Sequence, residues 1–221
     1  MDALGRLVAR RPDSPKVATT DFYQLGTSHN YKRFSLTADL FLIGTSNQQV
    51  YVPDDGSLEF AGPGRSYGFE VKNSVQLTRR LSFNGGLTRV MNAFYRGTRP
   101  REYVDSAPHA VANAGLTLSD YRGFSGSLRY RHTGGYRLDP LDAGVRASGL
   151  DVVDLGVNKR LRRDLDFNLS IDNLFDKRYY ETQNFFESRV RPGEEPAARI
   201  HATPGFPFGV TVGVTYRFRG K

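Results

Sequence analysis

The stretch "LDFNLSIDNLFDKRYYE", residues 165–181, starts with the pattern of a β-strand and ends in a cluster of polar and aromatic residues. In the first half, apolar and polar residues alternate without exception: Leu165, Phe167, Leu169 and Ile171 against Asp166, Asn168, Ser170 and Asp172. Alternation with a period of two predicts a strand that has one apolar and one hydrated face. The pattern then breaks at Asn173, Leu174, Phe175, Asp176, Tyr179 and Tyr180. A long irregular segment is therefore expected after residue 173.

The same alternation returns along most of the chain. It predicts nine strands, at about 18–27, 33–44, 65–77, 81–95, 108–118, 123–133, 151–160, 164–173 and 207–218. Their length suits a tilted strand that crosses a bilayer, which needs about 9–11 residues. In the last strand one side is predicted to face lipid and consists of Val210, Val212, Val214, Tyr216 and Phe218. The opposite sides of several strands carry charges of both signs: Glu70, Lys72, Arg129, Arg131, Asp154, Asp166 and Asp172.

The connections between these strands alternate strictly in length. The links near 28–32, 78–80, 119–122 and 161–163 are short, and those near 45–64, 96–107, 134–150 and 174–206 are long. Outer-membrane barrels combine tight periplasmic turns with large external loops in this way. A compact soluble domain rarely carries four long loops on one side. An antiparallel transmembrane up-and-down barrel segment is thus favoured. A soluble antiparallel ligand-binding module and a small passive porin stay open as alternatives.

Loop 45–64 contains a hairpin signal of its own. Two short apolar runs, at 50–52 and 58–60, flank the sequence "PDDGS". An Asp-Gly pair between such runs favours a tight β-turn. We therefore expect a small hairpin within this external loop.

Composition excludes several other classes of protein. The 221 residues have no Cys and no Trp, a mean hydropathy of -0.49 and no apolar run long enough for a transmembrane helix, so neither a disulfide framework nor a helical span is expected. The net charge of +8 is spread along the chain without a recognition motif, and nucleic-acid binding is not expected. The start, "MDALGRLVARRPDSPK", has no apolar stretch and does not read as a signal peptide. Residues 1–17 are predicted to be an irregular lead, and residues 18–221 the barrel portion.

Two C-terminal segments carry a resemblance to a known family. "IDNLFDKRYYE" at 171–181 resembles the segment of TonB-dependent outer-membrane receptors in which the penultimate strand enters the last external loop. "PGFPFGVTVGVTYRF" at 204–218 resembles the final strand of the same receptors. Weaker similarity lies in "SLTADLFLIGTSNQQVYVPDDG" (35–56) and "RSYGFEV" (65–71).

The resemblance implies a C-terminal portion of a receptor barrel in the outer membrane of a Gram-negative-type bacterium. Such receptors take up a scarce solute, for example a siderophore, a glycan or a cofactor, through a plugged barrel of about 22 strands. The implied partners are outer-membrane lipid, the barrel assembly machinery, the remainder of the receptor, and TonB through an N-terminal part that these residues do not include. Nine strands are too few for that barrel, so the chain is expected not to transport by itself.

Enzyme chemistry finds little support in the sequence. The four histidines are dispersed without metal-ligand spacing, and no G-x-S-x-G motif is present. We expect no catalytic residue, no metal site and no cofactor.

Candidate contacts for a solute lie in the predicted external loops. They combine aromatic rings with arginines: Arg101, Tyr103, Tyr136, Arg137, Phe185, Phe186 and Arg189. The cluster from Asn173 to Tyr180 has two interpretations. It could contact a ligand in the last loop, or its Asn and Asp side chains could bond freed backbone groups while Leu174, Phe175 and the tyrosines pack at the rim. The structural interpretation is favoured.

Overall fold

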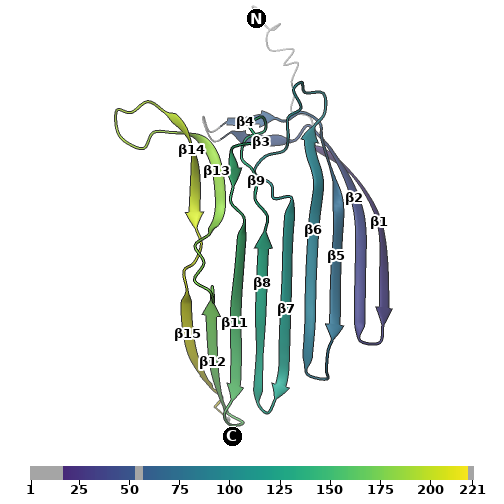
Figure 1. The fold of residues 1–221 in the computed structure, drawn as a ribbon, viewed down its shortest axis with the longest axis vertical. Helices are drawn as coiled ribbons and strands as arrows, with labels where there is room; N and C mark the ends of the chain where they lie inside the picture. Colours follow the sequence, from purple (N-terminus) through teal and green to yellow (C-terminus); the bar gives the residue numbers. More distant parts are fainter. Residues whose placement is uncertain (1–16, 53–56, 219–221) are drawn as a thin grey trace, which may run out of the picture.

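The computed structural model describes residues 17–52 and 57–218, and one large antiparallel sheet dominates this part of the chain (Figure 1). Its strands pair in the order β1-β2-β5-β6-β7-β8-β11-β12-β15, so each long strand pairs with the next one along the chain. The bounds are β1 (Thr19–Tyr31), β2 (Phe34–Ser46), β5 (Gly64–Gln76), β6 (Leu81–Tyr95), β7 (Ala110–Tyr121), β8 (Phe124–Thr133), β11 (Leu150–Arg160), β12 (Leu165–Asp172) and β15 (Gly209–Tyr216). The predicted all-β, up-and-down fold and its nine long strands are confirmed.

Short turns and long loops lie at opposite ends of this sheet. The turns after β1, β5, β7 and β11 are at the lower end in Figure 1, and the loops after β2, β6, β8 and β12 are at the upper end. We call these the short-turn end and the long-loop end. The segregation is the one predicted from the alternating link lengths.

Three small hairpins lie at the long-loop end. They pair β3 (Gln49–Val52) with β4 (Ser57–Phe60), β9 (Tyr136–Arg137) with β10 (Arg146–Ala147), and β13 (Tyr180–Ser188) with β14 (Ala197–Pro204). The first is the hairpin predicted for loop 45–64, although its Asp-Gly turn at 53–56 lies outside the described residues. The expectation that 174–206 is irregular is wrong, because β13 and β14 pair from Ser188↔Ala197 back to Tyr180↔Pro204. Apolar and β-branched residues that recur on both arms support this pairing.

The first long strand extends further than its sequence suggests. The polar run Ser28–Asn30 reads as a turn, yet β1 continues to Tyr31, which pairs with Phe34. A turn of two residues remains, and Lys32 in it has a φ of 49°. The predicted turn at 28–32 therefore begins too early. Polar residues at the end of a strand have the same composition as a loop, so the sequence pattern does not separate the two.

Cross-strand register aligns the apolar residues of six strands into a continuous row. This row runs through Leu81, Leu118, Gly126, Val157, Leu169 and Val212. The adjacent row, on the other face, runs through Ser82, Thr117, Ser127, Gly156, Ser170 and Thr211. Because successive side chains point to opposite faces, the sheet has one apolar and one hydrated surface.

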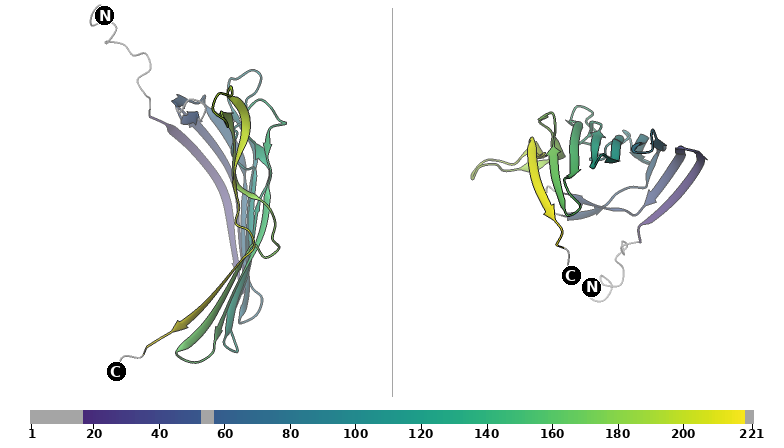
Figure 2. Two further views of the ribbon diagram at one scale, coloured as in Figure 1. Left: turned by 90° about the vertical axis from the view of Figure 1, so that its left-hand side faces the viewer. Right: turned by 90° about the horizontal axis from the view of Figure 1, so that it is seen from below.

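The sheet is curved but not closed. Figure 2 shows it bent into a trough, with β1 and β15 at the two edges. β1 starts at the long-loop end and β15 finishes at the short-turn end (Figure 1). The open edges present unpaired backbone groups, which hydrocarbon does not tolerate. The arrangement is an incomplete barrel, as predicted.

The apolar surface has no protein cover among the described residues. Val210, Val212 and Val214 on β15 are 52%, 59% and 67% exposed. The buried apolar cluster is small and consists of Leu150, Val152 and Tyr179. A soluble sandwich would bury such a surface against a second sheet, so this alternative is not favoured. Within the described ranges, no helix is long and apolar enough to cross a membrane.

Candidate functional site

A hollow at the long-loop end has a volume of about 890 Å³. We call it the loop chamber. Its walls come from the ends of β2, β5 and β6, from the β6–β7 loop and from β13. The lining residues include Arg65, Tyr95, Asp105, His109, Phe185 and Phe186. The chamber thus combines aromatic rings with a cation, a carboxylate and an imidazole.

Backbone hydrogen bonds hold the β6–β7 wall of the chamber in place. The Tyr95 N–H donates to the Glu102 carbonyl at 3.0 Å, and the Val104 N–H donates to the Ala93 carbonyl at 3.1 Å. Ser106 donates its N–H to the Arg137 carbonyl at 2.8 Å. The loop is therefore bonded both to its own strand and to the neighbouring β8–β11 loop, which makes it a fixed wall.

The opposite wall depends on Gln183, a residue that sequence reasoning missed. Gln183 is 6% exposed, and its carbonyl oxygen Oε1 accepts from the Ser148 N–H at 3.2 Å. Its Nε2 donates back to the Ser148 carbonyl at 2.9 Å. The Tyr136 hydroxyl donates to the Gln183 backbone carbonyl at 3.4 Å. These bonds attach β13 to the β8–β11 loop, and no spacing in the sequence signals them.

The charge of the chamber is affected by arginines around His109. Burial lowers the pKa of His109 below its ordinary value of 6.5, and the positive charges of Arg89, Arg137 and Arg146 lower it further. The imidazole is therefore neutral at pH 7. A neutral imidazole among guanidinium groups offers one donor and one acceptor beside fixed positive charge.

The structure brings together some of the predicted solute contacts and separates others. Phe185 and Phe186 line the loop chamber, and the Phe186 ring stacks on His201 with centroids 3.9 Å apart. The Arg137 guanidinium lies 4.4 Å above the Tyr103 ring.

Tyr103, Arg137 and the remaining predicted contacts lie outside the lining of the chamber. The Arg101 guanidinium lies 4.8 Å above the Phe94 ring. Tyr136 is part of the Gln183 contacts described above. Arg189 is exposed and does not line the chamber.

The predicted polar-aromatic cluster forms a hydrogen-bonded knot where β12 ends. Asn173 is 1% exposed, and its Nδ2 donates to the carbonyls of Lys177 and Phe206, both at 2.9 Å. Its Oδ1 accepts from the Lys177 N–H at 3.0 Å. The Phe208 N–H donates to Asp176 Oδ1 at 3.2 Å. The structural interpretation of this cluster stays a prediction, and these bonds support it.

Backbone conformation explains the choice of Asn and Asp in the knot. Asn173 and Asp176 have φ values of 50° and 48°. Asn and Asp tolerate this left-handed region better than other residues with a side chain. Tyr179 is buried, whereas Phe175 and Tyr180 are 67% and 46% exposed. Tyr179 therefore packs against the protein while Phe175 and Tyr180 point outward, and the packing of these aromatic residues at the rim stays a prediction.

Charged residues of the hydrated face surround the knot. The Asn173 N–H donates to Asp154 Oδ1 at 3.1 Å, and the Oδ2 of the same carboxylate lies 3.7 Å from Arg129 and 3.8 Å from Arg131. The Tyr179 hydroxyl donates to Glu181 at 3.1 Å. Burial raises the pKa of Tyr179, and the bond to Glu181 adds to the rise. Of the predicted face charges, Asp154 thus pairs with Arg129 and Arg131.

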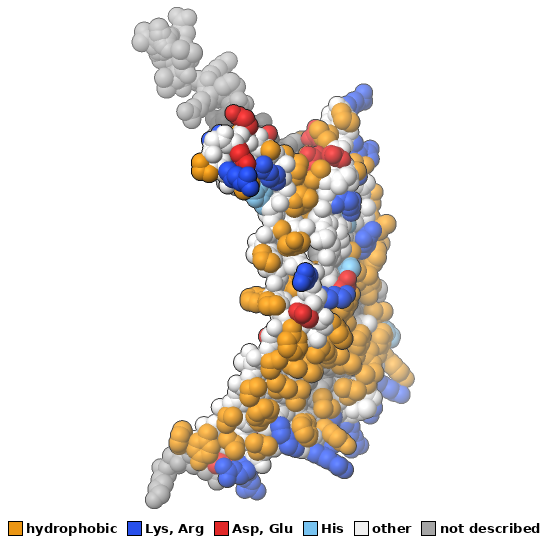
Figure 3. All heavy atoms as spheres, turned by 60° about the vertical axis from the view of Figure 1, so that its left-hand side comes forward, with side chains coloured by type: hydrophobic (Ala, Val, Ile, Leu, Met, Phe, Trp, Pro, Cys, Tyr) orange, Lys and Arg blue, Asp and Glu red, His pale blue; other side chains and the backbone are white. Residues whose placement is uncertain are grey.

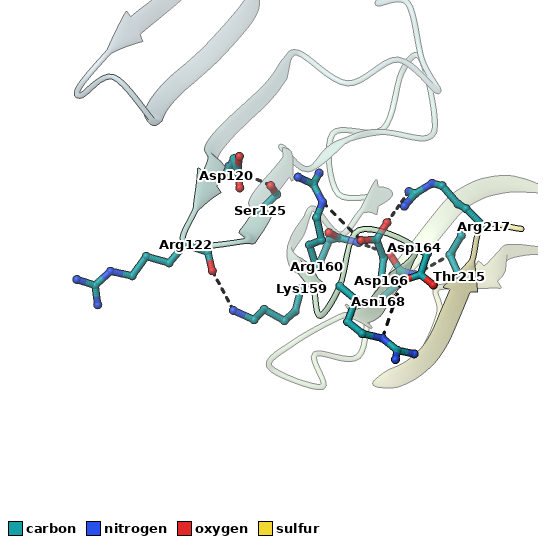
Figure 4. Close-up of polar contacts among 12 residues, drawn as sticks. Asp120, Arg122, Ser125, Lys159, Arg160, Asp164, Asp166, Asn168, Thr215 and Arg217 are labelled. Atoms are coloured by element: carbon teal, nitrogen blue, oxygen red, sulfur yellow. Dashed lines mark hydrogen bonds and ion pairs between the residues drawn. The ribbon is translucent and has the colours of Figure 1, made fainter. Parts of the chain in front are cut away.

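A second polar cluster lies at the short-turn end (Figure 4). The Asp166 carboxylate is buried, and two guanidinium groups converge on it. Arg217 donates to its Oδ2 at 2.5 Å, and the Arg160 Nε lies 3.8 Å from its Oδ1. Nearby, the Lys159 ammonium donates to the Arg122 carbonyl at 2.9 Å. This cluster joins β11, β12 and the region after β15.

Comparisons with solved structures agree on the fold. The closed form of the ferric-catecholate import receptor Fiu of Escherichia coli K12 has a TM-score of 0.69 and 23% identity, over 92% of this chain and 28% of that one. The ferric yersiniabactin uptake receptor FyuA of Yersinia pestis has a TM-score of 0.71 and 18% identity, over 91% and 30%. At these identities the likeness shows the fold alone.

Sequence comparisons identify the relatives. The catecholate siderophore receptor Fiu of Escherichia coli K12 is 30% identical over 196 residues, which are 84% of this chain and 25% of that protein. The metal-pseudopaline receptor CntO of Pseudomonas aeruginosa is 27% identical over 170 residues, 73% of this chain and 24% of that protein. The chain therefore spans about a quarter of the length of the curated relatives it matches. Both relatives are named as receptors and not as enzymes. A family model described as "TonB dependent receptor-like, beta-barrel" matches residues 16–174, and the chain belongs to this family of outer-membrane receptor barrels.

Proposed function

We propose that the chain forms the C-terminal part of the barrel wall of an outer-membrane TonB-dependent receptor for the active uptake of a scarce metal chelate. The observation that carries the proposal is the loop chamber, placed at the long-loop end of a sheet with one lipid-facing and one hydrated surface. In outer-membrane barrels this end faces the outside, where a solute first arrives.

The chemistry of the chamber suits an anionic chelate with flat donor groups. A volume of about 890 Å³ is within the range of small-molecule sites. Phe185 and Phe186 offer aromatic faces, and Arg65 offers a positive charge. The relatives named for catecholate siderophores and for metal-pseudopaline support a chelate over a glycan or another cofactor.

Transport itself is expected to need more than these 221 residues. Coupling to TonB depends in this family on an N-terminal plug and coupling segment, and the open edges at β1 and β15 need further strands as partners. The barrel assembly machinery is the expected agent of insertion. We therefore expect that the chain binds solute without moving it across a bilayer.

Binding can be tested through the protein's own fluorescence. The chain has 12 Tyr and no Trp, so a ferric tris-catecholate complex that absorbs in the near ultraviolet would quench a tyrosine signal. We expect saturable quenching for the 221-residue chain folded in detergent micelles. Phe185→Ala removes an aromatic wall and is expected to weaken binding about fivefold, the effect of about 1 kcal/mol of aromatic contact.

Arg189→Ala is the matched control, because Arg189 belongs to the same hairpin region but lies outside the chamber. Equal losses in both variants, or quenching that does not saturate, would contradict the proposal. Liposome swelling assays provide the transport arm: no solute entry is expected. Swelling by the chain alone would instead favour a passive porin.

A further inference from the structure

A groove crosses the apolar face near the short-turn end. It consists of two adjoining hollows of about 330 and 620 Å³, which share Leu81, Leu118 and Tyr121. We call it the outer groove. Its apolar part is lined also by Leu116, Phe124, Gly126, Leu128, Leu155 and Val157, and its other part reaches Thr78, Arg79 and Arg80.

A missing side chain creates the apolar part. Gly126 lies on the apolar face between Phe124 and Leu128, in register with Leu118 on one side and Val157 on the other. Its neighbours along this row carry branched aliphatic side chains, so Gly126 leaves a gap. A Cβ at this position would meet the Gly156 carbonyl oxygen at 2.5 Å, so the close approach of β11 also requires glycine.

The polar part of the groove carries positive charge in a fixed turn. The Thr78 hydroxyl accepts the N–H groups of Arg80 and Leu81 at 3.2 and 3.0 Å. The guanidinium groups of Arg80 and Arg122 lie 5.8 and 5.6 Å from the Tyr121 ring. Both arginines and Arg79 are exposed, and none has a carboxylate within ion-pair distance among the described residues.

This lack of partners distinguishes these three arginines from others at the same end. Arg160 and Arg217 converge on Asp166 (Figure 4), and Arg162 lies 3.9 Å from Asp164. Figure 3 shows hydrophobic side chains over the lower half of the molecule, with Lys and Arg directly below them. The groove thus connects an apolar surface with cations that have no carboxylate partner in residues 17–52 and 57–218.

We propose that the outer groove binds an anionic phospholipid, with its phosphate beside Arg79, Arg80 and Arg122 and an acyl chain in the gap at Gly126. The proposal rests on the membrane placement given under Proposed function. Short turns of outer-membrane barrels face the periplasm, so the ligand comes from the periplasmic leaflet. The groove lies over β6, β7, β8 and β11, which are interior strands of the sheet, and further barrel strands would add at β1 and β15 instead.

Native mass spectrometry of the detergent-solubilised 221-residue chain tests the proposal. The probes are phosphatidylglycerol and phosphatidylethanolamine with identical acyl chains, and we expect phosphatidylglycerol to be retained preferentially. A basic residue at an anionic lipid surface contributes roughly fivefold to binding. The double variant Arg79→Ala/Arg80→Ala is therefore expected to lose roughly tenfold or more in phosphatidylglycerol retention.

Two further variants separate the parts of the groove. Lys32→Ala/Arg33→Ala removes the same charge from another short turn and is expected to change retention less than about twofold. Leu118→Trp narrows the hollow that both parts share, and it is expected to weaken the retention of both lipids. Glycerophosphate without acyl chains is expected not to bind.

Several results would overturn the inference. They are equal retention of phosphatidylglycerol and phosphatidylethanolamine, equal losses of phosphatidylglycerol retention in the two double variants, and unchanged lipid retention in Leu118→Trp. Binding of a second copy of the chain in place of a lipid would also overturn it. The tyrosine-quenching experiment checks the proposed function separately. A chain without saturable chelate binding contradicts the proposed function, whereas a chelate-binding chain without lipid preference contradicts only the outer groove.

Discussion

The two ends of the sheet terminate the same strands by opposite physical means. At the long-loop end, Asn173 is 1% exposed and both polar atoms of its side chain have protein partners. At the short-turn end, Arg79, Arg80 and Arg122 are exposed and have no carboxylate partner in the described part of the chain. One end uses polar groups to order the backbone, and the other leaves charge available to its surroundings.

The difference follows from what each end must do. A strand that continues into a 36-residue segment, from Asn173 to Phe208, needs partners for the backbone groups released from the ladder. A tight turn such as Lys32–Arg33 releases few groups, so its side chains are not needed for bonding. Sequence changes at the knot around Asn173 should therefore mainly affect folding stability, and changes at Arg79, Arg80 and Arg122 should mainly affect interaction with the surroundings.

The largest effect is expected for Asn173→Ala. The change removes three side-chain bonds in a buried site and places Ala at a φ of 50°. Unpaired buried groups cost about 1–3 kcal/mol each, partly relieved by relaxation, so we expect a loss of about 3 kcal/mol in the free energy of unfolding. Urea unfolding in detergent, followed by tyrosine fluorescence, measures it. Asn173→Gly also removes the side-chain bonds, but glycine adopts a positive φ without strain, so its loss in the free energy of unfolding should be about 1 kcal/mol smaller. Equal losses in the two variants would show that the left-handed backbone conformation contributes nothing.

Gly205→Ala is expected to have the next largest effect at the same end. A Cβ at Gly205 would overlap the Tyr179 ring. The backbone carbonyl of Tyr179 accepts the Gly205 N–H at 2.9 Å, which holds the two residues together. Overpacking of this kind costs about 1–3 kcal/mol. The same unfolding experiment measures it, and limited proteolysis should show earlier cleavage within 174–208. In a Tyr179→Ala background the added cost should largely vanish; additive losses would locate the strain elsewhere.

Asp166→Asn tests the stability contribution of the opposite end. The change removes the shared partner of Arg160 and Arg217, whose side chains are each 56% exposed. Solvent screening reduces the contribution of such ion pairs to stability, and we expect a loss of about 1 kcal/mol in the free energy of unfolding. The loss should shrink in high salt, which urea unfolding at two salt concentrations can show. Asp164→Asn, next to a single arginine, serves as the control with a smaller loss; a salt-independent effect would exclude an ionic origin.

The smallest effect concerns the pH dependence of the loop chamber. Because the pKa of folded His109 lies below 6.5, the unfolded chain binds more protons as the pH falls below that value. Stability is therefore fully present above about pH 6.5 and falls as the pH approaches the folded pKa. NMR titration of the imidazole measures the pKa directly, and His109→Gln should remove this part of the pH dependence. A folded pKa at or above 6.5 would contradict the prediction.

The sequence predicts the wall of the molecule better than its loops. Strands such as β12 and β15 are predictable because apolar and small or polar residues alternate along Leu165–Asp172 and Gly209–Tyr216. The β13–β14 hairpin was missed, because the apolar residues at Phe185 and Ile200 do not alternate regularly with polar ones. Gln183 gave no signal at all, since a buried glutamine and an exposed one look alike in a sequence.

What the chain determines by itself is periodicity: side chains alternate across a strand, so the apolar face, the hydrated face and the segregation of short and long links follow from the order of residues alone. Tertiary structure alone decided which distant groups meet. Asn173 reaches Phe206, Gln183 reaches Ser148, and Arg217 reaches Asp166. Contacts between residues more than 30 positions apart depend on strand register and loop path, and no local pattern specifies either of them.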